Sequence, residues 1–483
     1  MEYPSFVGGS YKANNPFAAN ELTINWYPAP LESEGALARW HLVPTPGVAV
    51  WPRFDSVGLS GPGRAFGLFN GRLFAVLGSA FVEFVNGLPG GIIYTYGTIA
   101  GTPNRATMAY NGTGGHQIHI TGGGISYIFD TVSGVLTLAT NQSPSGMASS
   151  TAMLDGYFFM LDQAANTVYQ SALLDGNLFN SLDKAQRIVA DDPWRQIGVL
   201  GKELFLLGQY TSEVWYGAGT FPFTIAPHPS GAIEIGIAAD FSLAKVGSSL
   251  FWLAQTRNVR AQVVQADGLQ PQVVSDLAVQ AAMGRYARID DAIGFAFADV
   301  DGHEFYGLTF PSGDTTWCYD LMTRRWHERR TWYAEQSRWG CWRPLYHARF
   351  DGQNLTLSLD SPDLLQLVDT LGTDLDRPVR RVRQAPHVTN QLERIYFSRF
   401  RLHLHAGQGA ISGQGVDPMV ELQVSNDGGE TFYSEGYSGA GRLGEYNRFP
   451  EWTRLGSAEN RQFRIETTDP TPWRIVGAYL DAT

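Results

Sequence analysis

The chain has 483 residues, of which 44% are hydrophobic and 17% charged, so it is long enough for two or three domains with a large buried core. Its formal net charge is 35 − 46 = −11. An average surface of this sign repels nucleic acid, which argues against a general DNA-binding protein but not against a protein that lets DNA slide past without binding it.

The composition favours β structure. Glycine (54 residues) and aromatic residues (13%) are abundant, which is typical of strands joined by many turns. Only two short segments, 182–190 and 276–283, have the composition of a helix.

No sequence signal points to export or to a membrane anchor. Residues 1–5 lack a basic-then-apolar signal, and no run of about 18 apolar residues occurs. The two cysteines, Cys318 and Cys341, form no disulfide framework, so we expect two buried free thiols, with a disulfide between them left open. We therefore expect a soluble protein made in a cytosol.

The first 50 residues have little alternation and are rich in Asn, Pro and Ala. The proline-containing stretches 13–16 and 27–30 cannot continue a helix and disfavour a central strand. We predict an extended N-terminal arm over residues 1–50 that lies across another part of the protein. A turn at 44–47 (PTPG) marks the start of regular structure.

Residues 51–370 contain a weak repeat of hairpins. Each unit begins with a Gly or Asp-Gly turn, which is followed by a strand of alternating apolar and polar residues and then by a second strand that would pair with it. The opening glycines are Gly71, Gly115, Gly156, Gly201, Gly247 and Gly302, so the gaps are 44, 41, 45, 46 and 55 residues. This period predicts a β-propeller of about six blades, with five or seven also open. The alternative is an irregular β-rich protein.

The clearest unit is 302–329, in which two turns separate three alternating stretches. It ends with Tyr319-Asp320, a polar turn and Trp326, a pattern typical of the end of a propeller blade.

Residues 371–483 are predicted to form a β-sandwich-like domain, with strands at 419–425, 431–433, 462–467 and 474–480. The turn after the first of these fits the Asp-box pattern of sialidase propellers, in which the Asp carboxylate accepts backbone N–H bonds and a glycine takes a positive φ. Its residues are Ser425, Asp427, Gly429, Thr431 and Phe432. We interpret it as a structural turn. The motif occurs once and outside the repeats, and no pair of catalytic carboxylates can be located in the sequence, so a glycosidase is disfavoured.

The most basic stretch lies between residues 377 and 401, where seven arginines accompany one acid, Glu393. One interpretation is a patch that faces a partner or DNA. Its candidates are Arg377, Arg380, Arg381, Arg383 and Arg394. The other interpretation is strand arginines paired with neighbouring acids, which the alternation in 399–405 favours.

No motif predicts catalysis. The pairs His116/His119 and His403/His405 lack a nearby Cys or carboxylate cluster with zinc spacing. A phosphate-binding loop, a Gly-x-Ser-x-Gly elbow and a dinucleotide fingerprint are also missing. We expect no enzymatic activity, no metal and no cofactor.

Several short motifs occur in order along nearly the whole chain. They are 25–28 (NWYP), 44–47 (PTPG), 63–74 (beginning GRAF), 212–215 (SEVW), 316–329, 452–456 (WTRLG), 468–470 (TDP) and 477–478 (GA). Together they resemble the packaged-DNA stabilisation proteins of short-tailed bacteriophages, also described as tail accessory or tail nozzle proteins. Residues 357–361 depart from the resemblance, because Gly-Asp is expected there, and this puts the register of the last blade in question.

The resemblance implies a structural protein of the virion tail. Copies would form a ring, a hexamer, below the head-to-tail adaptor protein, where the ring continues the DNA channel and stabilises packaged DNA. Further implied partners are tail fibre, spike or needle proteins and genomic DNA that passes without sequence-specific binding. Two alternatives remain: a receptor- or carbohydrate-binding propeller of the tail, which predicts a pocket rimmed by tryptophans and acids, and a bacterial propeller unrelated to phages.

Overall fold

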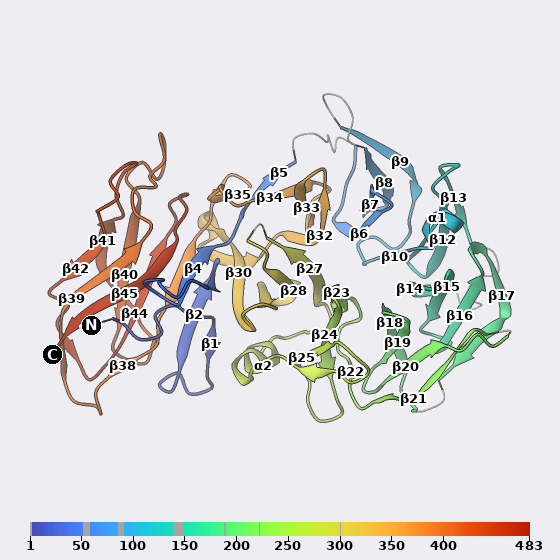
Figure 1. Ribbon diagram of the computed structural model, residues 1–483, viewed down its shortest axis with the longest axis horizontal. Coiled ribbons are helices and arrows are strands. Elements are labelled where there is room, and N and C mark those ends of the chain that lie inside the picture. Colours follow the sequence, from blue (N-terminus) through green and yellow to red (C-terminus); the bar gives the residue numbers. More distant parts are fainter. Residues whose placement is uncertain are drawn as a thin grey trace.

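The computed structural model describes residues 2–51, 58–85, 91–139, 148–187, 190–221, 223–299 and 301–483. The fold is almost entirely β. Figure 1 shows a ring of small sheets and, beside it, a second β domain that holds both ends of the chain. The predicted class, a β-propeller followed by a β-sandwich, is confirmed.

Seven antiparallel sheets form the ring in the described residues. The first four are β6–β9 (Gly63–Phe69, Arg72–Leu77, Ala80–Val85, Ile92–Thr98), β10–β13 (Thr107–Tyr110, Gln117–Gly122, Ile125–Asp130, Val135–Leu138), β14–β17 (Ala148–Leu154, Tyr157–Asp162, Thr167–Ala172, Asp175–Gln186) and β18–β21 (Trp194–Leu200, Glu203–Gly208, Ser212–Gly217, Ile225–Ile233). The fifth is β22–β26 (Gly236–Ile237, Ala244–Val246, Ser249–Gln255, Gln262–Ala266, Gln272–Val273) and the sixth β27–β30 (Ile293–Ala298, Glu304–Phe310, Thr315–Asp320, Arg325–Tyr333). The seventh combines β32–β34 (Pro344–Phe350, Gln353–Ser358, Leu364–Val368) with β5 (Gly47–Val50).

The ring therefore has one blade more than the predicted count of about six. The seventh blade opens at the Asp351-Gly352 turn, in the same place as the other opening glycines. Its fourth strand, β5, comes from the N-terminal segment and pairs antiparallel with β34, with Val48 opposite Leu367. On its inner side β32 lies against β6, which closes the ring. In the questioned stretch 357–361, Leu357 pairs with Leu345 and Ser358 with Pro344, and the register shift of this strand pair lies between Leu345 and Ala348.

Alternation along each strand explains why the blades need one another. In β19, Leu204 and Leu206 contribute to the apolar cluster shared with the preceding blade, whereas Phe205 and Leu207 contribute to the cluster shared with the following blade. All four side chains are fully buried. Because successive side chains point to opposite faces, each blade buries two apolar faces only when it has two neighbours.

The second domain is a sandwich of two sheets. One contains β2, β37, β44, β40 and β41 (Asn20–Ile24, Arg381–Gln384, Asn460–Thr467, Met419–Ser425, Tyr433–Gly439). The other contains β3, β4, β45, β39 and β42 (Trp26–Pro30, Trp40–Pro44, Ile475–Ala482, Ile395–Leu404, Glu451–Thr453). Phe400 and Phe463 stack between them with ring centroids 5.1 Å apart, in a core that also contains Trp26 and Trp452.

Short elements complete the described structure. They are β1 (Tyr11–Lys12), β31 (Arg338–Cys341), β35 (Thr373–Asp374), β36 (Arg377–Pro378), β38 (Val388–Thr389), β43 (Ser457–Ala458), the helices α1 (Gly112–Gly115) and α2 (Leu277–Gly284), and the 3-10 turns η1 (Asp240–Ser242), η2 (Pro311–Gly313) and η3 (Ala334–Gln336).

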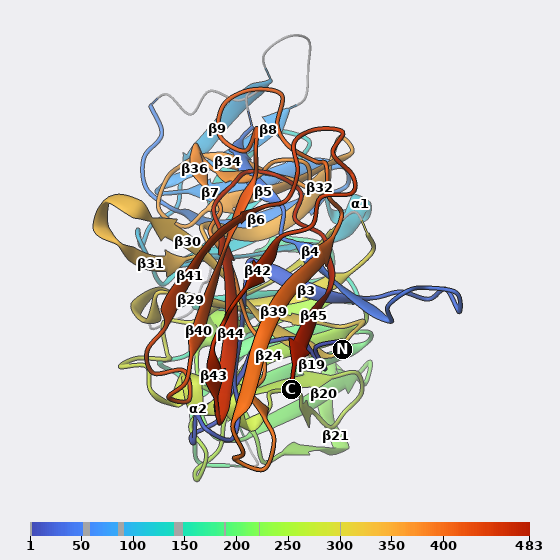
Figure 2. The ribbon, with the colours of Figure 1, turned by 90° about the vertical axis from the view of Figure 1, so that its left-hand side faces the viewer.

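The N-terminal segment joins the two domains instead of lying over them as an arm. Ile24 of β2 pairs with Glu328 of β30 on one side and with Val382 of β37 on the other, so one twelve-stranded sheet runs through propeller and sandwich. The hairpin β3–β4 extends the second sandwich sheet. The proline-containing β3 lies at the edge of this sheet, where prolines are tolerated because one side of the strand has no partner strand that needs an N–H donor. Figure 2 shows this hairpin projecting from the molecule.

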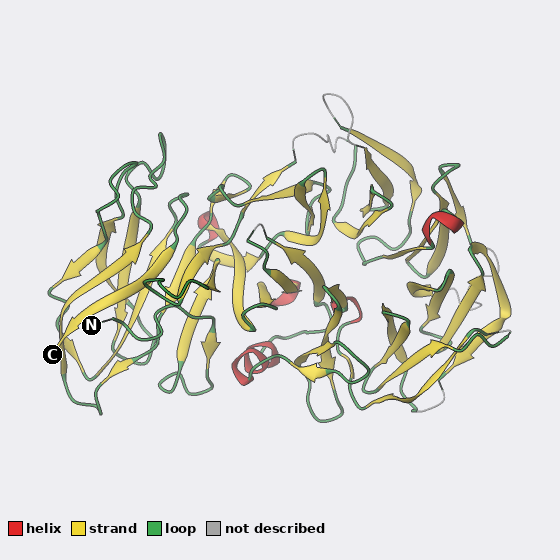
Figure 3. Cartoon of the chain, in the orientation of Figure 1, coloured by secondary structure: helices red, strands yellow, loops and turns green. Residues whose placement is uncertain are grey.

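One of the two expected helices is present. Helix α2, one of the red segments in Figure 3, begins after Asp276. The Asp276 side chain accepts a hydrogen bond from Val279 N at 2.8 Å. The other expectation, 182–190, is wrong over its described part, because residues up to Gln186 belong to β17 and pair with β16. Residues 188–189 lie outside the described residues. Strand pairing here overrides the helix propensity of the segment.

Candidate interaction surfaces

Two of the five candidate arginines lie inside the protein. Arg381 and Arg383 are on β37, which has paired strands on both sides, and both side chains are fully buried. The guanidinium of Arg383 donates to the carbonyl oxygens of Ser5, Phe6 and Gly9, to Thr23 Oγ1 and to Glu21 Oε2, at 2.6 to 3.1 Å. Burial lowers the pKa of Arg381 to about 10. The expectation that these two residues face a partner is therefore wrong.

The arginines of β39 are paired with acids on the outer face of the sandwich. Arg399 Nη2 lies 2.6 Å from Asp481 Oδ2, and Arg401 Nη2 lies 2.8 Å from Glu451 Oε2. Arg394 precedes the strand, is 62% exposed and lies 4.0 Å from an acid. Arg399 and Arg401 therefore form ion pairs with acids on neighbouring strands, which is the interpretation that the sequence alternation favours.

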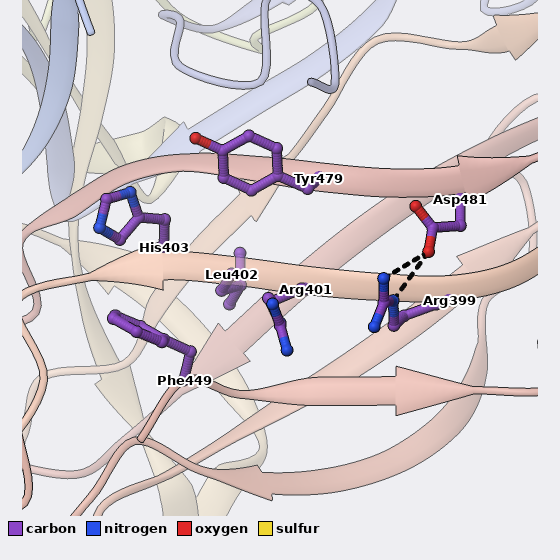
Figure 4. A pocket seen from close by; sticks show the side chains of 7 residues that line it. All are labelled: Arg399, Arg401, Leu402, His403, Phe449, Tyr479 and Asp481. Carbon is purple, nitrogen blue, oxygen red and sulfur yellow. Dashed lines mark hydrogen bonds and ion pairs between the residues drawn. The ribbon is translucent and has the colours of Figure 1, made fainter. Parts of the chain in front are cut away.

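A shallow pocket of about 350 Å³ lies on this face (Figure 4). It is lined by Arg399, Arg401, Leu402, His403, Phe449, Tyr479 and Asp481. The pocket has no tryptophan and one acid, and that acid neutralises Arg399. This pocket lacks the rim of tryptophans and acids that a carbohydrate-binding protein predicts, whereas another pocket, of about 560 Å³, has Trp40, Trp326, Glu21 and Asp276 in its lining.

The last two candidates, Arg377 and Arg380, pack on a hairpin that extends beyond the sixth blade. We call residues 330–341, which include the end of β30 and all of β31, the aromatic hairpin. Within it Trp332 pairs with Trp339, and their ring centroids are 5.0 Å apart in an edge-to-face arrangement. Trp332, Tyr333 and Trp339 are each partly exposed.

Arginines stack on Trp332 and on Tyr333 of this hairpin. Arg380 Cζ lies 3.9 Å from the ring centroid of Trp332, and Arg380 Nε also pairs with an acid at 2.7 Å. The Cζ atoms of Arg377 and Arg338 lie 5.1 and 4.9 Å from the ring centroid of Tyr333. These distances are typical of cation–π contacts. Sequence reasoning missed this surface, although Trp332 and Tyr333 directly follow the 302–329 unit.

A second exposed hairpin connects β3 to β4. We call residues 31–39 the acidic hairpin, because Glu32 and Glu34 lie exposed near its tip. Leu37 beside them is 75% exposed. A backbone hydrogen bond of 2.9 Å from Leu31 N to Arg39 O closes its base.

The Asp-box-like turn has the predicted form. Asp427 Oδ1 accepts hydrogen bonds from Glu430 N at 3.1 Å and Thr431 N at 3.0 Å, and Ser425 Oγ donates to it at 2.7 Å. Gly429 has a φ of 87°. The hydroxyl and N–H of Thr431 hold the pKa of Asp427 below its ordinary value. The Phe432 ring lies under Arg464, with Cζ 3.4 Å from its centroid.

The thiols and histidines have structural surroundings. Cys318 and Cys341 are free and buried, as expected, and burial raises the pKa of both thiols to about 12. His119 is fully buried, with Nδ1 2.6 Å from Thr151 Oγ1, and burial lowers its pKa to about 3. His403 packs edge-on against Phe449. Among the described residues, no three His, Cys, Asp or Glu side chains come together as a metal site.

In the part of the chain that the structure describes, no helix has the length and apolar character needed to cross a membrane.

Comparison with solved structures finds chains of low similarity. A virginiamycin B lyase from Staphylococcus aureus, crystallised with quinupristin, has 10% identity and a TM-score of 0.44 over 66% of this chain and 98% of the lyase. The N-terminal domain of Nup159 has 9% identity and a TM-score of 0.40, over 72% and 99% of the two chains. PorZ of Porphyromonas gingivalis has 10% identity and a TM-score of 0.39, over 80% and 52%. Similarities of this size carry no functional argument.

No curated protein matches the chain. Two family models do match it, one for each domain. The model described as the bacteriophage P22 Gp10 β-propeller matches residues 3–358, and the model described as the bacteriophage P22 Gp10 β-sandwich matches residues 380–483. Because the two matches cover both domains in order, the chain belongs to the bacteriophage P22 Gp10 family and is a structural protein of a phage tail.

Proposed function

We propose that copies of this chain form a ring, a hexamer, in the tail of a short-tailed phage. The ring lies below the head-to-tail adaptor, continues the DNA channel and keeps packaged DNA inside the head, without enzymatic activity. The observation that carries this proposal is the family match over both domains, 3–358 and 380–483.

The fold supports a rigid ring component. The twelve-stranded sheet joins propeller and sandwich through β2, so the chain can behave as one rigid body between its partners. We treat 51–370 as the propeller unit and 371–483 as the sandwich unit, with residues 1–50 shared between them. A net charge of −11 favours passage of DNA without sequence-specific binding, because acidic surfaces repel the phosphate backbone.

The proposed partners are the head-to-tail adaptor on one side of the ring and tail fibre, spike or needle proteins on the other. From the arginine-rich stretch 377–401, Arg394 and the partly exposed Arg377 remain candidates for contacts with these partners. Virion assembly takes place in the host cytoplasm, and the mature location is the tail.

Particles assembled without this protein test the proposal. Heads should package a full genome and then release it, as measured by DNase-sensitive DNA after a chase, and addition of the purified protein should prevent the release. Heads that retain their DNA but fail to infect would contradict the stabilising role. That result would favour the alternative of a receptor-binding tail component.

A further inference from the structure

The aromatic hairpin and the acidic hairpin project from opposite sides of the molecule. In Figure 2 the β30–β31 hairpin extends to the left and the β3–β4 hairpin to the right. Both are fixed at their bases: β31 pairs with β30 over Arg330 to Tyr333, and β3 pairs with β4 over all five residues. The molecule thus presents two different rigid protrusions in opposite directions.

The aromatic hairpin has the composition of a protein-binding hot spot. Tryptophan, tyrosine and arginine are the residues that contribute most often to binding free energy at protein interfaces. Here two tryptophans and Tyr333 are interleaved with arginines, and their mutual stacking fixes the side chains before any partner arrives. A surface ordered in advance loses little conformational entropy on binding.

The acidic hairpin has complementary chemistry. Glu32 and Glu34 form no ion pair with any described residue of the chain. Leu31 and Leu37 beside them are 37% and 75% exposed. Exposed leucines flanked by unpaired carboxylates match a partner that offers aromatic faces and guanidinium groups.

We propose that the acidic hairpin of one copy binds the aromatic hairpin of the next copy. Glu32 and Glu34 pair with Arg338 and Arg377, while the exposed leucines pack on Trp332 and Trp339. This inference rests on the ring of the proposed function and names the contact that builds it. Two different surfaces on opposite sides give a head-to-tail contact, and head-to-tail contacts close into rings when the rotation between copies permits.

A second copy fits the aromatic hairpin better than DNA does. Its arginines already have acids nearby, since Arg338 lies 3.6 Å from Asp314 and Arg380 lies 2.7 Å from Glu466. Glu335 is exposed at its tip. These carboxylates leave the hairpin with little net positive charge for a phosphate backbone, whereas Arg377 forms no ion pair with a described residue and can pair with a carboxylate of the acidic hairpin. DNA contact is the competing outcome of the test.

Charge reversal in the full-length protein tests the pairing. The first variant is Glu32→Arg with Glu34→Arg, the second is Arg338→Glu with Arg377→Glu, and the third combines all four changes. Native mass spectrometry of the protein, alone and recovered from adaptor-bearing heads, measures the oligomer. Lys202→Glu with Lys245→Glu, at exposed positions of other blades, is the matched control, and circular dichroism confirms that every variant is folded.

We expect each two-residue reversal to abolish the ring and the four-residue variant to restore it, with the control unchanged. If the ring persists in both two-residue reversals, the proposed contact between the hairpins is wrong, but the ring of the proposed function is retained. Loss of DNA retention by the arginine reversal with an intact ring also overturns the proposed contact, in favour of DNA contact. A wild-type protein that remains monomeric even on heads removes the proposed ring and this contact together.

A covalent trap gives an independent readout. Glu34→Cys combined with Arg338→Cys should yield disulfide-linked ladders of copies under mild oxidation, because the two native thiols are buried. Glu34→Cys combined with Lys202→Cys should give no ladder. Equal ladders from both pairs would contradict the contact.

Discussion

The side chain of Asn25 forms two hydrogen bonds with the backbone of Arg330. Asn25 Oδ1 accepts from Arg330 N at 2.9 Å, and Asn25 Nδ2 donates to Arg330 O at 2.8 Å. Nδ2 also donates to the carbonyl oxygen of Arg380 at 2.8 Å. The amide thus takes the place of a neighbouring strand where β2 ends, and it ties the propeller to the segment that leads into the sandwich.

Replacing Asn25 by Ala should weaken this junction. Three part-buried backbone groups would lose their partner, and Ala would have to adopt the φ of 58° that Asn tolerates. We expect a loss of about 3–5 kcal/mol in the free energy of unfolding, measured by urea titration. Asn258→Ala, at an exposed turn, is the control and should change stability by less than about 0.5 kcal/mol.

Gly47 at the start of β5 tests the closure of the ring. A Cβ at this position would lie 2.4 Å from Leu371 O and 2.6 Å from Thr373 O, both of them backbone atoms that cannot rotate away. Gly47→Ala should therefore destabilise the seventh blade by about 1–3 kcal/mol. In Gly477→Ala the new Cβ meets no neighbour, so its melting temperature should match the wild type. Equal melting curves for both variants would contradict the close packing of β5 against residues 371–373.

Arg383 and Arg394 separate a structural arginine from a surface arginine. Arg383→Ala leaves Glu21 without its buried partner and removes the donors of several backbone carbonyls. We expect a loss of about 3–5 kcal/mol in the free energy of unfolding. Arg394→Ala should change it by less than about 0.5 kcal/mol. A charge reversal that includes Arg381 or Arg383 would unfold the sandwich and could not report on docking.

Asp427 should make stability depend on pH. Its pKa lies below the ordinary value in the folded protein, so it contributes stability above the unfolded pKa of about 4 and loses it as the pH falls further. The melting temperature of Asp427→Asn should be lower than the wild type at pH 7, and the difference should shrink below about pH 4. A difference that stays constant down to pH 2 would contradict the role of the carboxylate. Asp267→Asn, at an exposed position, is the control.

The two thiols should be unreactive in the folded state. Burial raises the pKa of Cys318 and Cys341 to about 12, and only the thiolate attacks a maleimide. At pH 8 we expect no labelling of the native protein within an hour and two labels per chain in urea, as measured by intact mass. Rapid labelling of the native protein would mean that one of these strands opens readily.

Local signals made much of the propeller predictable. Five of the six predicted glycines, such as Gly156 or Gly302, have a positive φ in the turn before the strand that they were predicted to open, whereas the sixth, Gly115, ends α1. The seventh opening, Asp351-Gly352, has the same form but precedes a polar strand, Gln353–Ser358, so the hydrophobic alternation was weak there. Its closing strand, β5, lies about 300 residues away in sequence, a distance that no local pattern can bridge.

The interaction surfaces were harder to predict. A run of arginines does not reveal which side chains lie between two sheets, and Arg383 is buried only because β2 and β44 flank its strand. Likewise, the aromatic hairpin depends on β30 extending past its partner β29, where Trp332 meets Trp339 and Arg380. Such contacts between distant segments follow from the fold and not from spacing in the sequence.

Cryo-electron microscopy of intact tails tests the central claim most directly. The account predicts a closed ring of identical copies directly below the adaptor, with density for DNA along its axis and with the acidic hairpin of each copy on the aromatic hairpin of its neighbour. A single copy at the distal end of the tail, or a tail whose channel is complete without this chain, would contradict it.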